Sequence, residues 1–353
     1  MKAIGSGSRA AGRHRMRRSF AAADSVFIAD ASIPRFYRES AGLRRRPFHG
    51  TLTFLKQIVL SLPKERILSM CRLLGMIRTG DANLPAWKQM VGAPNALRLQ
   101  AETGCVPPGS EPGHTDSWGV GWFDEGGDVS LIRNTGSAAD SAYFVFAGES
   151  AGRGNRTVLA HLRKASVGAL SSANAHPIRV DYSGRGNRSG RPYETLLVAH
   201  NGTIRTPLQS TLRDAAGEGD REEARADSDT VLLAGYLAAR LEAAESGEGT
   251  FDTLTGALRD LFRKARQVGA DSYTAVNLLL AHPSGLYALR QFTKNADYYS
   301  LSVRPLTPGA DEGASGYVIA SEPTDAAGEW AMLEPGLLMH YGADGAVRSA
   351  AVV

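Results

Sequence analysis

The sequence predicts an α+β fold with layered β-sheets, and two observations support this prediction. Short β-rich runs separated by turn signals follow Met70, helical patterns come next, and strands then return near the end of the chain. Strands grouped before and after helices favour an α+β architecture over a doubly wound parallel sheet. Hydrophobic residues also make up 43% of the 353 residues, which is enough to bury a sizeable core.

Each element is predicted from its periodicity and its flanking turn residues. Short β-rich runs between turn signals predict strands, and longer apolar patterns at helical spacing predict helices. The expected strands are Cys71–Ile77, Trp118–Phe123, Val129–Ile132, Val158–His161, Leu196–His200, Tyr273–Ala281, Gly285–Gln291, Tyr298–Val303, Tyr317–Ala320 and Leu337–Tyr341, and the expected helices are Asp229–Ala244 and Phe251–Val268.

The chain divides at Met70 into a basic extension, residues 1–69, and a domain, residues 70–353. The extension carries 14 Lys+Arg and 4 Asp+Glu, a net charge of +10. The whole chain has 40 Lys+Arg and 36 Asp+Glu, so the domain carries 26 Lys+Arg and 32 Asp+Glu, a net charge of −6. With little periodicity and clustered arginines, the extension is expected to be mostly disordered. The basic balance of the whole chain therefore gives no reason to expect the domain to bind nucleic acid.

Two cysteines, Cys71 and Cys105, are too few for a disulfide framework and favour a reducing, cytoplasmic compartment. The apolar stretch Leu52–Leu62 is interrupted by polar residues and is too short to span a bilayer. We therefore expect no membrane association. One of the two thiols is a candidate nucleophile.

Five local patterns stand out, although each alone has an ordinary structural explanation. A cysteine after a methionine is usually a small buried hydrophobe, Asn-Gly after a strand is a common turn, and Ser-Asp before an apolar run is a helix N-cap. The patterns are Met70-Cys71-Arg72-Leu73-Leu74-Gly75, Ala160-His161-Leu162-Arg163-Lys164-Ala165-Ser166, Asn174-Ala175-His176-Pro177, Ala199-His200-Asn201-Gly202-Thr203-Ile204 and Asp227-Ser228-Asp229-Thr230.

Together and in this order, the patterns resemble the class II glutamine amidotransferases, which have the N-terminal-nucleophile (Ntn) hydrolase fold. Asp116-Ser117-Trp118-Gly119 and Ala320-Ser321-Glu322-Pro323 with Trp330 add to the resemblance. It is closest to standalone members, including γ-glutamyl hydrolases. The resemblance implies a four-layer αββα sandwich of two stacked, mainly antiparallel sheets. Lys164 stands where amidosugar-forming relatives have an aromatic residue, which argues against hexosamine synthesis.

The resemblance also assigns roles to five residues. Cys71 would attack the γ-amide carbon, with its own α-amino group as the base if it is the first residue. Asn201 and the backbone N–H of Gly202 would hold the oxyanion. Arg163 would bind the α-carboxylate and Asp229 the α-ammonium of glutamine or of a γ-glutamyl compound. No cofactor or metal is expected.

Three histidines allow a rival interpretation, a papain-like pair with Cys71. No matching protease signature surrounds Cys71, and the spacing of His161, His176 and His200 fits no familiar zinc pattern. We therefore expect these imidazoles to be structural, bonded to nearby backbone. Cys105 is expected to be incidental.

The 69 residues before Met70 conflict with a free amine on Cys71. Translation could begin at Met70 with later removal of the methionine, a propeptide could be cleaved, or the extension could stay and leave the domain inactive; we favour the first explanation. Three functions remain open at this point: a standalone γ-glutamyl hydrolase, which we favour slightly, a glutaminase subunit that delivers ammonia to a separate synthase, and a non-catalytic amino-acid-binding module.

Overall fold

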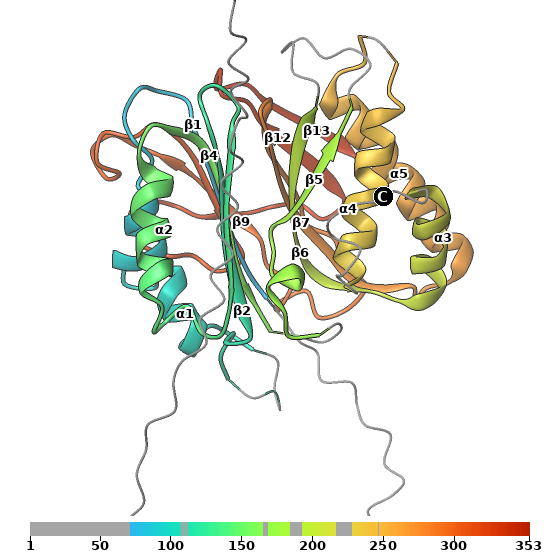
Figure 1. The fold of residues 1–353 in the computed structure, drawn as a ribbon, viewed down its shortest axis with the longest axis horizontal. Helices are drawn as coiled ribbons and strands as arrows, with labels where there is room; N and C mark the ends of the chain where they lie inside the picture. The colour runs from blue at the N-terminus through green and yellow to red at the C-terminus, as the bar shows by residue number, and fades with distance from the viewer. Residues whose placement is uncertain are drawn as a thin grey trace, which may run out of the picture.

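Two antiparallel β-sheets stacked face to face form the centre of the protein in a computed structural model (Figure 1). The structure describes residues 71–106, 110, 112–164, 169–183, 193–216, 228–245 and 247–353. The predictions for the extension and for Asp227 lie outside these residues. The strands are β1 (Arg72–Arg78), β2 (Ser117–Asp124), β3 (Val129–Thr135), β4 (Asn155–Arg163), β5 (Ile178–Tyr182), β6 (Glu194–Ile204), β7 (Tyr273–His282), β8 (Gly285–Leu289), β9 (Ser302–Leu306), β10 (Gly316–Ala320), β11 (Ala331–Met332), β12 (Leu337–Tyr341) and β13 (Val347–Ala351).

Helices cover the outer face of each sheet and make four layers. Within the described residues, the first sheet has the order β11-β9-β10-β1-β4-β2-β3 and the second β13-β12-β8-β7-β6-β5. In Figure 1 the short helices α1 and α2 lie outside the first sheet, and α3, α4 and α5 lie outside the second. The helical segments are η1 (Lys88–Gly92), α1 (Leu97–Thr103), α2 (Ala142–Gly152), η2 (Ser172–Asn174), α3 (Thr206–Ala216), α4 (Asp229–Glu242) and α5 (Thr250–Val268).

The central strands are buried on both faces, and β1 shows how their side chains divide. Leu73 and Ile77 pack between the sheets, whereas Leu74 and Met76 pack against the layer that contains α2. Successive side chains of a strand point to opposite faces, so β1 contributes to two cores at once. A third core fills the space between the second sheet and α3, α4 and α5. The αββα prediction is confirmed.

The sequence-based elements differ from the structure mainly in what they omitted. The predictions missed α1, α2, α3, β5, β11 and β13. The buried face of α2 consists largely of Ala and Gly around Phe144 and so shows a weak helical pattern. They also placed a strand at Tyr298–Val303, but β9 begins only at Ser302. The residues before it turn instead, because Asn295, at a φ of +61°, accepts the backbone N–H groups of Tyr298 and Tyr299.

A buried ion-pair network centred on Arg304 of β9 holds the outer part of the first sheet together. The guanidinium is 1% exposed and donates to both carboxylate oxygens of Asp311, at 2.8 and 2.9 Å, and of Asp325, at 3.1 and 2.8 Å. Lys88 of η1 lies 3.4 Å from Asp311 and 3.9 Å from Asp325. The network thus ties β9 to η1 and to two loops.

Arg304→Met is expected to lower the free energy of unfolding by about 3–5 kcal/mol, because it leaves two buried carboxylates without their main cation. Urea denaturation measures this change. Arg348→Met is the matched control: its ion pair with Asp252 is half exposed, so its loss should cost less than about 1 kcal/mol. Equal effects of the two substitutions would contradict the prediction.

Candidate active site

Cys71 lies immediately before β1, 9% exposed, and its main chain is clamped by Asn201 of β6. The Cys71 backbone N–H donates to Asn201 Oδ1 at 3.1 Å, and Asn201 Nδ2 donates back to the Cys71 carbonyl at 3.2 Å. Asn201 is fully buried. This reciprocal pair joins the two sheets at the predicted nucleophile, so the residue's nitrogen and thiol are fixed relative to each other.

The Cys71 thiol is a poor nucleophile by itself. Burial raises its pKa to about 11, although a backbone hydrogen bond at Lys164 and the cationic side chains of Arg163 and Arg72 oppose the shift. The protonated thiol can also donate from Sγ to the Lys164 carbonyl, at 3.7 Å. At pH 7 roughly one thiol in 10⁴ would carry the thiolate. The geometry therefore calls for a base next to Sγ.

Gly202 follows Asn201 at a position that only glycine fits. Its φ is +143°, and a Cβ there would lie 2.0 Å from the Ala275 carbonyl oxygen and 3.0 Å from His200 Nε2. The register of β6 against β7 shifts between Gly202 and Ile204. The neighbouring β7 backbone therefore requires glycine at this position.

Arg163 and Asp229 reach the same region from β4 and α4. Arg163 ends β4, is 4% exposed, and donates from Nη1 to the Ala169 carbonyl at 3.2 Å. Asp229 opens α4, is 7% exposed, and accepts the Ile204 backbone N–H at 2.6 Å through Oδ2. Arg163 lowers and Asp229 raises the pKa of the Cys71 thiol, although burial is the largest influence. The structure therefore brings all five predicted site residues together.

The three histidines are held by each other and by nearby groups. His200 bonds the Ala275 carbonyl and Thr230 Oγ1, both at 3.1 Å, while His176 Nδ1 lies 3.3 Å from His161 Nε2. Burial lowers the pKa of both His161 and His176 well below the usual value. Over the described parts of the chain, no hydrogen bond joins these imidazoles to Cys71, and no group of three potential ligands could hold a metal ion. The papain-like interpretation is not supported.

Three residues beside Cys71 had no predicted role. Arg72 donates from Nη1 to the Cys71 carbonyl at 3.1 Å and pairs with Glu322 at 3.1 Å. The Tyr299 hydroxyl bonds Thr274 at 3.2 Å, and its pKa is raised by burial and then by Cys71. Arg72 and Glu322 lie in motifs that carried the family resemblance, which assigned them no role, and Tyr299 belongs to no such local pattern.

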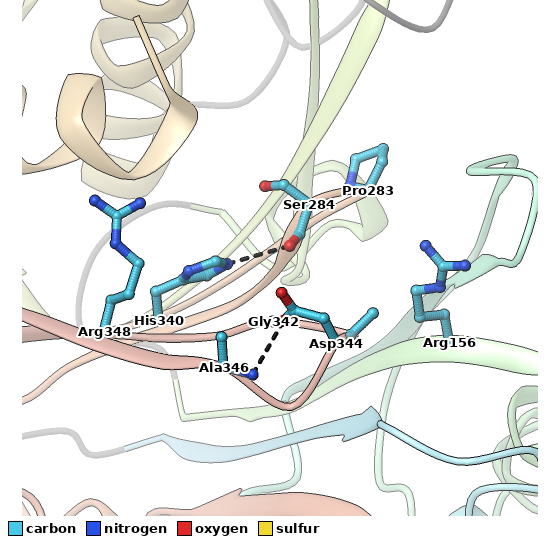
Figure 2. Close-up of a pocket in the computed structure, with 9 residues that line it drawn as sticks. Arg156, Pro283, Ser284, His340, Gly342, Asp344, Ala346 and Arg348 are labelled. Atoms are coloured by element: carbon cyan, nitrogen blue, oxygen red, sulfur yellow. Dashed lines mark hydrogen bonds between the residues drawn. The ribbon is translucent and has the colours of Figure 1, made fainter.

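An open hollow of about 570 Å³ lies at the other end of β4 (Figure 2). Arg156, near the start of that strand, lines it together with residues of the β7–β8 and β12–β13 turns, whereas Arg163 ends the strand beside Cys71. In Figure 2 the ring of His340 points to the Ser284 carbonyl, at 3.1 Å. None of the predicted site residues lines this hollow.

In the described residues no helix is both long and apolar enough to cross a membrane.

Comparison with solved structures supports the fold. Glutamine phosphoribosylpyrophosphate amidotransferase from B. subtilis aligns with a TM-score of 0.51 and 17% identity, over 80% of this chain and 49% of its own. A glutamine aminotransferase class-II domain protein from Silicibacter pomeroyi aligns with a TM-score of 0.50 and 16% identity, over 80% of this chain and 99% of its own. The chain thus spans about half the length of the first of these proteins and nearly all of the second.

No curated protein matches the sequence. The family model described as "Glutamine amidotransferases class-II" matches residues 95–352. That range includes Arg163, Asn201, Gly202 and Asp229 and begins after Cys71. This chain, with its two stacked antiparallel sheets, belongs to the class-II glutamine amidotransferases.

Proposed function

We propose that the enzyme hydrolyses the γ-amide of glutamine or of a γ-glutamyl compound through a thioester on Cys71, and that it does so only when Cys71 is the first residue. The observation that carries this proposal is the pairing of the Cys71 main-chain nitrogen with Asn201 Oδ1 at 3.1 Å, beside a buried thiol of high pKa. As an amide, this nitrogen has no basic lone pair. As a free α-amine it would titrate near ~7.7–8.0 and could take the thiol proton.

Proton transfer from Sγ to this amine would give a thiolate that attacks the γ-carbonyl carbon. The oxyanion would be held by Asn201 and the Gly202 N–H. Asn201 Nδ2 carries two hydrogens, and one of them already donates to the Cys71 carbonyl at 3.2 Å, which fixes the direction of the other. The ammonium of Cys71 would then protonate the leaving nitrogen, and water would hydrolyse the thioester.

Arg163 and Asp229 would recognise the amino-acid end of the substrate. A guanidinium matches the planar α-carboxylate, and a carboxylate accepts from the α-ammonium. Asp229 is already oriented through Oδ2 by the Ile204 N–H, so its other oxygen would face the ligand. Both side chains are nearly buried, which strengthens each charged contact.

Arg163→Met is expected to raise the KM for glutamine by about 10–100-fold, because it removes a charge-assisted hydrogen bond of about 1.5–3 kcal/mol. Asp229→Asn should act in the same direction, since it keeps an oxygen for the Ile204 N–H but removes the charge. Initial-rate kinetics measure both effects. Arg156→Met, at the far end of β4, should leave KM unchanged, and an equal rise there would refute the assignment.

We favour a standalone hydrolase of a γ-glutamyl compound as the finer function. Residues 70–353 form one domain in this proposal, and the Silicibacter domain protein, covered over 99% of its length, is of comparable extent. Purified enzyme should release glutamate from a panel of γ-glutamyl peptides in preference to glutamine. The reverse preference would favour the second candidate, a glutaminase subunit that serves a separate acceptor enzyme. Coverage of only 49% of the B. subtilis enzyme keeps that candidate open.

A start at Met70 followed by removal of the methionine would supply the free amine, because aminopeptidase action is feasible when the next residue is as small as cysteine. Mass spectrometry of the active protein from its native host tests this: an N-terminus upstream of Cys71 in active enzyme would rule it out. Cys71→Ala separates hydrolysis from a purely regulatory role. It should abolish glutamate release, and a biological function that survives it intact would favour an amino-acid-binding module.

A further inference from the structure

Arg72, the residue after the proposed nucleophile, contacts the backbone of Cys71. Its side chain is 2% exposed and packs against the loop that contains Gly104 and Cys105. Nη1 donates to the Cys71 carbonyl at 3.1 Å, and Nη2 donates to the Cys105 carbonyl. The Cys71 carbonyl therefore accepts two hydrogen bonds, one from Arg72 and one from Asn201 at 3.2 Å.

Glu322 completes the arrangement on the other side of Arg72. Its Oε2 lies 3.1 Å from Arg72 Nε and accepts the Cys105 backbone N–H at 3.0 Å, while its Oε1 accepts from Asn95 at 3.1 Å. Glu322 follows β10, the strand that pairs with β1. The ion pair thus fixes the start of β1 to a neighbouring strand end and to the loop at Cys105.

We propose that the Arg72–Glu322 pair positions the nucleophile. Arg72 holds the Cys71 carbonyl and stabilises the thiolate, and Glu322 partly offsets the positive charge of Arg72. This inference rests on the proposed role of Cys71, but it concerns two residues to which that proposal assigns no contact with the substrate. A guanidinium one residue from a buried thiol acts through a medium of low polarity, where a single charge has a large effect.

Several other groups act on the thiol, and the Arg72 contribution must be separated from theirs. Arg163 of β4 and a backbone hydrogen bond at Lys164 stabilise the thiolate, and Asp229 of α4 opposes it. Tyr299 lies close enough for Cys71 to raise its pKa. Burial lowers the pKa of Arg72 itself, while Glu322 and both cysteines raise it. Substitutions of Arg72 and Glu322 change one charge each and leave those other groups in place.

The test is the rate at which iodoacetamide alkylates Cys71 in the full 353-residue chain, followed against pH by mass spectrometry of the Cys71 peptide. Arg72→Met should move the midpoint of the profile up by about one pH unit, so that alkylation below the midpoint slows about tenfold. Glu322→Gln should move it down, because Arg72 then stays uncompensated. Arg72→Lys keeps the charge and should recover most of the shift.

Arg78→Met is the matched control, because Arg78 lies at the far end of β1, is 7% exposed, and also pairs with a glutamate, Glu125. Its profile should coincide with that of the unmodified chain. Midpoint shifts of the same sign in Arg72→Met and Glu322→Gln would indicate loosened packing alone and overturn the inference, as would no shift in either.

Alkylation requires no substrate, so the two proposals can fail separately. Opposite shifts in the full chain, together with no glutamate release by protein that begins at Cys71, would support the positioning role and refute the proposed hydrolysis. If enzyme that begins at Cys71 is active and Arg72→Met changes neither its kcat nor its pH–rate profile, the proposed hydrolysis is supported and the positioning role of Arg72 is refuted.

Discussion

Enzyme that begins at Cys71 is expected to lose activity by a factor of about 10²–10⁴ when a single alanine is placed before Cys71, the range typical for loss of a general base. The added residue converts the α-amine into an amide and changes no side chain. Amide and amine both carry the N–H that bonds Asn201 Oδ1 at 3.1 Å, so the fold should be unaffected. The measurement is kcat for glutamate release from glutamine and from γ-glutamyl peptides.

Two controls accompany this comparison. The extended protein should melt at the same temperature, and its Cys71 should keep a high alkylation midpoint, because burial already raises the thiol pKa to about 11. With Cys71 first, the rate should rise with pH as the amine loses its proton, since only the neutral amine can accept the thiol proton. Full activity of the extended form would show that another group is the base.

Gly202→Ala is expected to abolish activity and to destabilise the fold by several kcal/mol. The new methyl group would lie 2.0 Å from the Ala275 carbonyl oxygen, so β6 must move away from β7 or adopt a different φ. Either movement displaces the Gly202 N–H and the neighbouring Asn201, the two proposed oxyanion donors. Thermal unfolding and kcat measure the two consequences.

Gly269→Ala separates the cost of a positive φ in a non-glycine residue from the cost of a steric clash by the new Cβ. Gly269 has a similar φ, +129°, but a Cβ there would meet nothing within 4 Å. It should cost only the conformational strain, about 1–3 kcal/mol, and leave kcat unchanged. If Gly202→Ala were no worse than Gly269→Ala in stability and retained activity, the oxyanion assignment to this strand would be wrong.

Local patterns in the sequence were sufficient to predict the α+β class and most of the strands that carry the site. Asn201 and Gly202 end a strongly apolar run, and Asp229 opens a helix with a clear pattern, so their positions follow from short stretches of chain. The four-layer arrangement came from the family resemblance. Helix α2 escaped prediction because small residues form its buried face.

The contacts around Arg72 could not be predicted in the same way. Arg72 meets Glu322 because β1 pairs with β10, and strand order in a sheet is not encoded in either segment alone. The reason for glycine at position 202 is likewise a contact with β7, a strand distant in sequence. Local periodicity shows which residues lie at strand ends, but tertiary pairing decides which ends meet.

The reciprocal bonding between Cys71 and Asn201 has a consequence for how the enzyme would mature. Asn201 Oδ1 can accept a hydrogen bond from any nitrogen at residue 71 that carries a hydrogen. An amide, a neutral amine and an ammonium all carry one. The contacts of the Cys71 main chain with Asn201 are therefore expected to form during folding, whatever precedes residue 71. Liberating the amine would switch on the chemistry without any rearrangement of the chain, so the inactive and active forms should be nearly superimposable.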